Sequence, residues 1–309
     1  MSRFTTRAVG LPLLLAFLYI AWGSTFLAIA SVVDHIPPLT VGALRFMAAA
    51  AILLPIVVTR RSWRTVLPSR RQLPYDVLGG VLLFTIGNGC IVSAQSAGVP
   101  SWLASLLIAT VPVWVALLRV VWGPRPRAVV LIGVVLGLGA SALLLASPDS
   151  LSIGPGALSL GIASAIGWSV GTYITARRGG ADDPLVTSFR QIAIGGIGLV
   201  LVAVAFERDE WSGITWTVQA AGSLLWLTVV SSVLALIVFY RIVGLSSVSV
   251  ASTYAFANPL VALTLSVVVL SEWPGARSAV AIPLIIVAVA MIVLGDRATA
   301  KRGEVHSGT

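Results

Sequence analysis

The fold is decided by the segment Leu11–Ala30, LPLLLAFLYIAWGSTFLAIA, in which twenty consecutive residues include no charged side chain. A helix rises about 1.5 Å per residue, so about 20 apolar residues cross the ~30 Å hydrocarbon core of a bilayer. This segment therefore predicts a transmembrane helix.

The rest of the chain repeats this signal. We find nine further apolar segments: Leu39–Val58, Val77–Gln95, Trp102–Leu118, Ala128–Ser147, Gly156–Ala176, Leu185–Phe206, Ala220–Tyr240, Val250–Leu270 and Ser278–Leu294. Of the 309 residues, 58% are hydrophobic and only 10% are charged, whereas a soluble domain carries about 25% charged residues. We predict an all-α integral membrane protein with ten transmembrane helices.

The positive charges lie in short clusters between these segments. With ten spans both termini lie on one side, and sixteen of the twenty Lys and Arg residues fall on that side. Only Arg208 and Arg277 fall on the opposite side. Cytoplasmic loops are enriched in Lys and Arg, so we predict a cell-membrane protein with both termini cytoplasmic. The net charge of +9 is then no sign of nucleic-acid binding.

Few residues are available for metal or cofactor chemistry. Cys90 is the single cysteine of the sequence, which excludes an internal disulfide and a zinc site built of cysteines. The two histidines, His35 and His306, are far apart in the sequence, and no phosphate-binding loop motif is present. We expect no metal and no cofactor.

The two halves of the chain resemble each other at an offset of 146 or 147 residues. Trp22 falls on Trp168, Pro38-Leu39 on Pro184-Leu185, Arg45 on Gln191, and Pro112 on Pro259. We therefore divide the chain into a first repeat at 1–150, a second repeat at 151–296 and a polar, disordered cytoplasmic tail at 297–309. Five spans per repeat invert the second copy in the membrane, which is typical of transporters with a midplane substrate site. A bundle without a transport role is the alternative.

Short motifs carry a resemblance to a known family. They are Trp22-Gly23-Ser24-Thr25, Pro38-Leu39 with Arg45-Phe46, the run 104–112, the run 249–252, and Asn258-Pro259 with Glu272. Over about residues 10–295 the sequence resembles the EamA-type permeases of the drug/metabolite transporter superfamily. The resemblance implies ten helices, inverted repeats and transport of metabolites such as amino acids. One departure is Arg125, where such proteins often carry an acidic residue that would match Glu272.

Arg45 is the sharpest single candidate. It lies six residues beyond Leu39, roughly 9 Å into its span. A charge at this depth is costly and faces a cavity or a partner, so Arg45 is a candidate for binding a substrate carboxylate. The equally weighted alternative is that it extends to the interface or pairs with Asp34. We expect Arg190, which enters its span from the cytoplasmic side, to reach that interface.

Other candidates are polar or aromatic side chains inside the spans. Asn88 and Gln95 are seven residues apart and share a helix face. The further substrate-binding candidates are Trp22 and Trp168, matched in mid-span, Gln191, matched to Arg45, Tyr254, and Asn258 from the family motif. Each of them could instead fill a gap or join two helices. Pro112 and Pro259 would break their helices and free carbonyl groups, or would only kink them.

These patterns predict a permease that is not an enzyme and moves a small carboxylate-bearing metabolite, such as an amino acid, by alternating access. The family suggests export. Its partners would be the small-molecule substrate and the lipid bilayer, and glycines such as Gly133 and Gly137 leave a homodimer open. The alternatives are a lipid or isoprenoid-carrier flippase and a membrane transferase. A transferase would use Glu207, Asp209 and Glu210, which we expect instead in a solvated loop.

Overall fold

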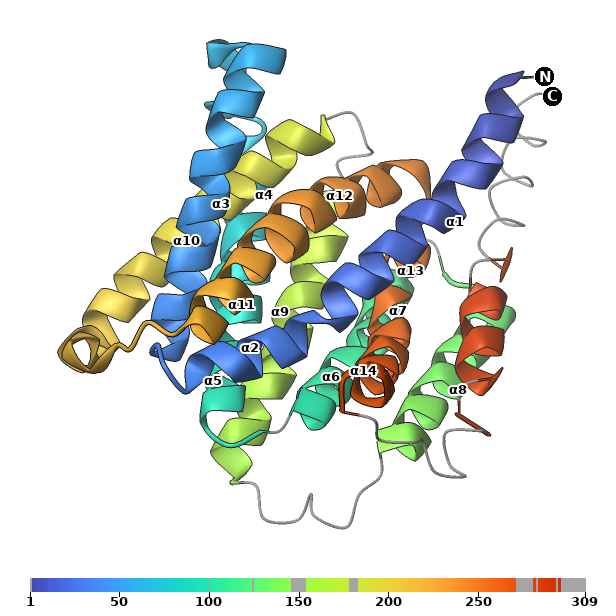
Figure 1. The fold of residues 1–309 in the computed structure, drawn as a ribbon. Coiled ribbons are helices and arrows are strands. Elements are labelled where there is room, and N and C mark those ends of the chain that lie inside the picture. Colours follow the sequence, from blue (N-terminus) through green and yellow to red (C-terminus); the bar gives the residue numbers. More distant parts are fainter. Residues whose placement is uncertain are drawn as a thin grey trace.

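The computed structural model describes residues 2–99, 101–123, 125–145, 154–177, 183–270, 280–281, 283–292 and 294–295. These residues fold into helices joined by turns and short extended stretches, with no β-strand among them (Figure 1). The first half holds α1 (Ser2–Gly23), α2 (Thr25–Val33), α3 (Pro38–Arg60), η1 (Trp63–Thr65), α4 (Leu73–Gly80), η2 (Val81–Asn88), α5 (Gly89–Ser96), α6 (Ser101–Ala109), α7 (Val111–Trp122) and α8 (Ala128–Leu145). The second holds α9 (Pro155–Ala176), α10 (Pro184–Phe206), η4 (Arg208–Gly213), α11 (Val218–Thr228), η5 (Val229–Leu234), α12 (Ala235–Leu245), α13 (Val248–Ala251), α14 (Tyr254–Leu270) and a helix at Pro283–Ile292.

Seven helical segments are long and apolar enough to cross a membrane. They are Gly10–Val33, Pro38–Arg60, Leu73–Ser96, Leu103–Trp122, Pro155–Ala176, Pro184–Phe206 and Val218–Leu245. Each coincides with one of the expected spans, so the chain is an all-α, multi-pass membrane protein.

The other three expected spans are helical where they are described. They correspond to α8, to α14 and to Pro283–Ile292. The described apolar helices Ala128–Ala140, within α8, and Pro283–Ile292 are shorter than the seven above. The total of ten spans stays a prediction. Glu272, the boundary between the repeats near residue 150 and the tail 297–309 lie outside the described residues.

Several expected spans are not continuous α-helices. The first is interrupted at Ser24, the fourth at Thr110, and the ninth between Ala251 and Tyr254. The third and the eighth contain wider π-helical turns, η2 and η5, between ordinary α-helical parts. Hydropathy predicts the length of a span, but it does not distinguish these interrupted helices from regular ones.

Helix starts follow from local chemistry. Proline occupies the first turn of α3, α9 and α10, where its missing N–H group costs nothing. Side-chain oxygens of Asp183, Thr217 and Ser247 accept hydrogen bonds from the first backbone N–H groups of α10, α11 and α13. These caps fix where the spans of the second half begin.

Helices from the two halves pack against each other, with α3 lying against α10 and η2 against α9 (Figure 1). Glycines allow the close approach of η2: a Cβ atom on Gly167 would lie 2.9 Å from the Leu82 carbonyl oxygen. On Gly195 it would lie 2.6 Å from the Gly80 carbonyl oxygen. The helix α1 packs along α12 and α14. Of the glycines expected to allow close packing in α8, Gly133 faces the Ala288 backbone within the same chain.

Candidate functional site

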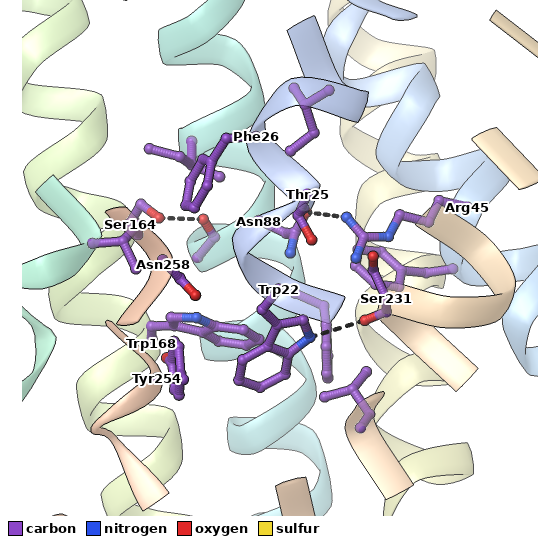
Figure 2. A pocket seen from close by; sticks show the side chains of 17 residues that line it. Trp22, Thr25, Phe26, Arg45, Asn88, Ser164, Trp168, Ser231, Tyr254 and Asn258 are labelled. Atoms are coloured by element: carbon purple, nitrogen blue, oxygen red, sulfur yellow. Dashed lines mark hydrogen bonds between the residues drawn. The ribbon is translucent and has the colours of Figure 1, made fainter. Parts of the chain in front are cut away.

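A cavity lies inside the bundle where the interrupted helices meet (Figure 2). The centres of water-sized molecules can occupy about 50 Å³ of it, within about 520 Å³ of space free of protein atoms that includes open solvent. Aromatic rings form much of its wall, namely Trp22, Phe26, Phe46, Phe84, Trp168 and Tyr254. The polar side chains of the wall are Thr25, Arg45, Asn88, Ser164, Ser231 and Asn258. The cavity therefore joins apolar surface to a few fixed polar groups, as small-molecule sites do.

Arg45 provides the positive charge of the cavity. Its side chain is 3% exposed, and its Nε donates to the Leu227 carbonyl oxygen at 3.1 Å and to Ser232 Oγ at 2.7 Å. Its Nη1 donates to Asn88 Oδ1 at 3.3 Å. Neither of the ion pairs between described side chains includes Arg45. The guanidinium is therefore held by neutral acceptors, and no carboxylate among the described residues pairs with it.

The two π-helical segments supply backbone carbonyl groups at this level. Trp22 Nε1 donates to the Ser231 carbonyl oxygen of η5 at 3.0 Å, and Ser164 Oγ donates to the Gly87 carbonyl oxygen of η2 at 2.5 Å. Arg45 contacts both segments, through Asn88 and Ser232. Wider π turns inside α-helices are frequent at functional sites because they redirect side chains and carbonyl groups.

Aromatic rings from both halves meet in the cavity wall. The ring centroids of Trp22 and Trp168 are 5.7 Å apart, and those of Trp22 and Tyr254 are 4.4 Å apart in an edge-to-face arrangement. Phe84 extends the cluster, 5.7 Å from Trp168. Such pairs are rigid, so they present a fixed apolar surface to whatever enters.

The comparisons with known proteins agree with this architecture. The model of one family, described as the EamA-like transporter family, matches residues 10–146 and 155–294. The chain belongs to this family.

Relatives of this EamA-like chain bear transporter names. "Uncharacterized inner membrane transporter YedA" of Escherichia coli (strain K12) is 29% identical over 280 residues, 90% of this chain and 89% of the relative. "Uncharacterized transporter YvbV" of Bacillus subtilis (strain 168) is 28% identical over 264 residues, 84% of each chain. A protein of known crystal structure matches with a TM-score of 0.75 at 21% identity, covering 94% of this chain and 99% of that one, which shows the shared fold alone. The EamA-like chain is a membrane transporter.

The structure brings six of the eight substrate-binding candidates together. Trp22, Arg45, Asn88, Trp168, Tyr254 and Asn258 all line the cavity. Arg45 neither extends to an interface nor pairs with Asp34, because its bonds run inward to η5 and Asn88. Whether these residues bind substrate stays a prediction.

Gln95 and Gln191 lie away from the cavity wall of the EamA-like chain. Gln95 Nε2 donates to the Phe26 carbonyl oxygen at 3.3 Å and to Ser101 Oγ at 3.2 Å. Gln191 donates to Thr175 Oγ1 and accepts from the Tyr240 hydroxyl at 2.6 Å. Both amides join helices in this structure, which was the alternative interpretation for each.

The two prolines occupy different positions in their helices. Pro112 lies in the first turn of α7, directly after the interruption at Thr110. Pro259 lies inside α14, next to the cavity residue Asn258. Neither proline lines the cavity itself.

Three features escaped the sequence-based prediction. Ser164 and Ser231 line the cavity, but serine is common in this sequence and no spacing singles them out. The ion pair of Arg190 had no sequence signal: Arg190 is 7% exposed and lies 3.3 Å from the buried Asp76 carboxylate, while its other donors reach the Thr65 and Leu67 carbonyl oxygens in the loop after α3. Glu207 is not in a solvated loop, because it is 4% exposed at the end of α10, whereas Asp209 and Glu210 are exposed as expected.

Proposed function

We propose that this EamA-like chain is a permease, and not an enzyme, that moves a small carboxylate-bearing solute such as an amino acid by alternating access. The solute would bind in the cavity with its carboxylate at Arg45 while the two halves rock about it. We propose export as the direction, following the family. The small solute and the bilayer are the partners of this proposal, and a homodimer is left open.

The buried charge of Arg45 is the observation that supports the substrate class. A guanidinium deep in a membrane protein is costly, and such a charge is expected to serve ions or substrates. Among the residues that the structure describes, no carboxylate pairs with it. Its planar fork of donors fits a carboxylate in two-point fashion, so an anionic group of the solute would complete the site.

Contacts between the halves support the proposal of two inverted five-helix repeats. In chain order α9 is the counterpart of α1 with α2, and η5 is the counterpart of η2. The helix α9 packs against α5 and α7, while α1 packs against their counterparts α12 and α14. The helices α3 and α10 are counterparts of each other, and they pack together. This exchange of equivalent contacts is what a pseudo-two-fold axis between the halves would produce.

Uptake and counterflow in proteoliposomes would test the proposed function. We would use a panel of labelled amino acids and organic acids with wild type, Arg45→Ala and Arg45→Lys. We expect saturable transport of a carboxylate-bearing solute that Arg45→Ala reduces more than about tenfold, because the charged hydrogen bonds are lost. Arg45→Lys should retain part of it, since it keeps the charge without the fork.

The matched control is Arg125→Ala, which removes one positive charge from an exposed position away from the cavity. It should transport as wild type does. Full transport in Arg45→Ala would remove Arg45 from the site. No transport of any panel member by a folded, inserted protein would contradict the proposal, and flipping of a labelled lipid by that protein would favour a flippase.

A further inference from the structure

Asn258 carries an unpaired acceptor at the cavity. It is 1% exposed, and its Oδ1 accepts no hydrogen bond from any residue that the structure describes. Buried polar atoms are nearly always paired in folded proteins, so an exception inside a binding cavity points to a ligand that supplies the missing donor. The other buried, unpaired acceptor among the described side chains is Gln95 Oε1, which lies off the cavity wall.

Asn258 and Arg45 lie on opposite sides of the cavity. Figure 2 shows Asn258 beside Trp168 and above Tyr254, whereas Arg45 lies beyond Trp22, toward Ser231. In this view the rings of Trp22 and Trp168, whose centroids are 5.7 Å apart, lie along the cavity wall from one side to the other. The cavity therefore has a positive end, an aromatic middle and an end that accepts a hydrogen bond.

We propose that the transported solute is elongated and has two polar ends. Its carboxylate binds Arg45, its apolar middle lies on Trp22 and Trp168, and an N–H or O–H group at its far end donates to Asn258 Oδ1. This inference rests on the proposed function. In an α-amino acid the ammonium group is on the carbon next to the carboxylate, so it stays at the Arg45 end and does not reach Asn258.

The chemistry of the far end also favours a neutral donor. The Asn258 amide is uncharged, and no Asp or Glu is among the residues that line the cavity. A cation there would be removed from water without a counter-charge, which is costly. A neutral amine or hydroxyl group needs only the one acceptor that Asn258 offers.

Three derivatives of 3-phenylpropionate test this proposal in proteoliposomes. They are 3-(4-aminophenyl)propionate, which has the remote donor, 3-(4-methylphenyl)propionate, its isosteric match without a donor, and 4-methylphenylalanine, whose only added donor lies beside the carboxylate. We expect wild type to prefer the aminophenyl acid over the methylphenyl acid by about tenfold in kcat/KM, the value of one net hydrogen bond. 4-Methylphenylalanine should show no such gain.

Variants assign the preference to Asn258. In Asn258→Leu, which keeps the branching at Cγ and removes the acceptor, the ratio of the two acids should fall to about one. Gln95→Leu likewise removes a buried amide oxygen that accepts no hydrogen bond from the described residues, but outside the cavity, and it should keep the wild-type ratio. A wild-type ratio of about one overturns the proposal without any variant, so the test stays decisive even if Asn258→Leu fails to fold.

Different failures have different meanings. If wild type transports carboxylates with a ratio of about one, or if the ratio persists in Asn258→Leu, this inference is wrong and the proposed function stands. A gain for 4-methylphenylalanine equal to that of the aminophenyl acid would also overturn it. If wild type transports neither these acids nor any other carboxylate, the proposed function fails and this inference fails with it.

Discussion

Arg45 and Arg190 are both buried arginines, but they are held by different kinds of partner. Arg190 pairs with the Asp76 carboxylate and donates to the backbone carbonyl oxygens of Thr65, Val66 and Leu67. Replacing it with alanine removes this ion pair from the buried Asp76 carboxylate and removes the Arg190 donors from the carbonyl oxygens of the loop before α4. Breaking such a pair costs about 3–5 kcal/mol, so Arg190→Ala should unfold at a clearly lower temperature in detergent.

Arg45→Ala is the variant to compare with Arg190→Ala, because it also removes a buried arginine. The Leu227 carbonyl oxygen keeps a second donor, Ser232 Oγ at 2.9 Å, and Asn88 faces a cavity that admits solvent. Removing Arg45 also leaves no carboxylate unpaired among the described residues. We therefore expect Arg45→Ala to lose transport with a much smaller shift in melting temperature than Arg190→Ala. Equal shifts would show that Arg45 is mainly structural.

At the scale of elements, α3 begins without a capping side chain of its own. Its N-cap residue is Pro37, so the N–H groups of Leu39 and Thr40 need acceptors from elsewhere. Glu207, at the end of α10, accepts from both at 2.7 Å and from Thr40 Oγ1 at 2.8 Å. An amide has only one acceptor oxygen, so Glu207→Gln should lower stability by about 1–3 kcal/mol.

Glu210→Gln is the control for this prediction, because Glu210 is exposed on the same loop. Thermal unfolding in detergent should show a lower melting temperature for Glu207→Gln than for wild type. The melting temperature of Glu210→Gln should equal that of wild type within experimental scatter. A Glu207→Gln protein as stable as wild type would mean that water replaces the carboxylate at the start of α3.

The sequence predicted elements better than it predicted their interruptions. A span is set by the apolar character of about 20 residues, which can be counted directly. The π turn at Val81–Asn88 depends instead on neighbours far along the chain, such as Gly167 and Gly195, whose missing side chains let η2 approach. The Trp22–Trp168 pair was found because the internal repeat matched the two positions, whereas Ser231 had no such signal.

Gln95 and Gln191 show the limit of arguments from position. Gln95 does share a helix face with Asn88. The spacing of seven residues places it about 10 Å farther along the helix, next to Phe26 and Ser101. Gln191 matches Arg45 by the repeat, and it lies against Gly80, which falls on Leu227 at the offset of 147. The repeat therefore matches the surroundings of Gln191 to those of Arg45, but Gln191 does not line the cavity.

For the whole molecule, the loop that follows α3 and the loop that follows α10 lie at opposite ends of the bundle (Figure 1). The first is rich in arginine, from Arg60 to Arg71, and the second carries Glu207, Asp209 and Glu210. The first turn of α1 lies at the same end as the arginine-rich loop (Figure 1). Cytoplasmic loops are enriched in Lys and Arg, so we propose that this end is cytoplasmic.

Thiol labelling would test this orientation because each end offers an exposed tryptophan. Trp63 is 66% exposed in the arginine-rich loop, and Trp216 is 61% exposed near the opposite end. In a Cys90→Ser background, which removes the one native thiol, Trp216→Cys should react with an impermeant maleimide on intact right-side-out vesicles. Trp63→Cys should react only after the vesicles are opened. The reverse pattern would place the N-terminal end of α1 outside, and it would reverse which end of the cavity must open to release an exported solute.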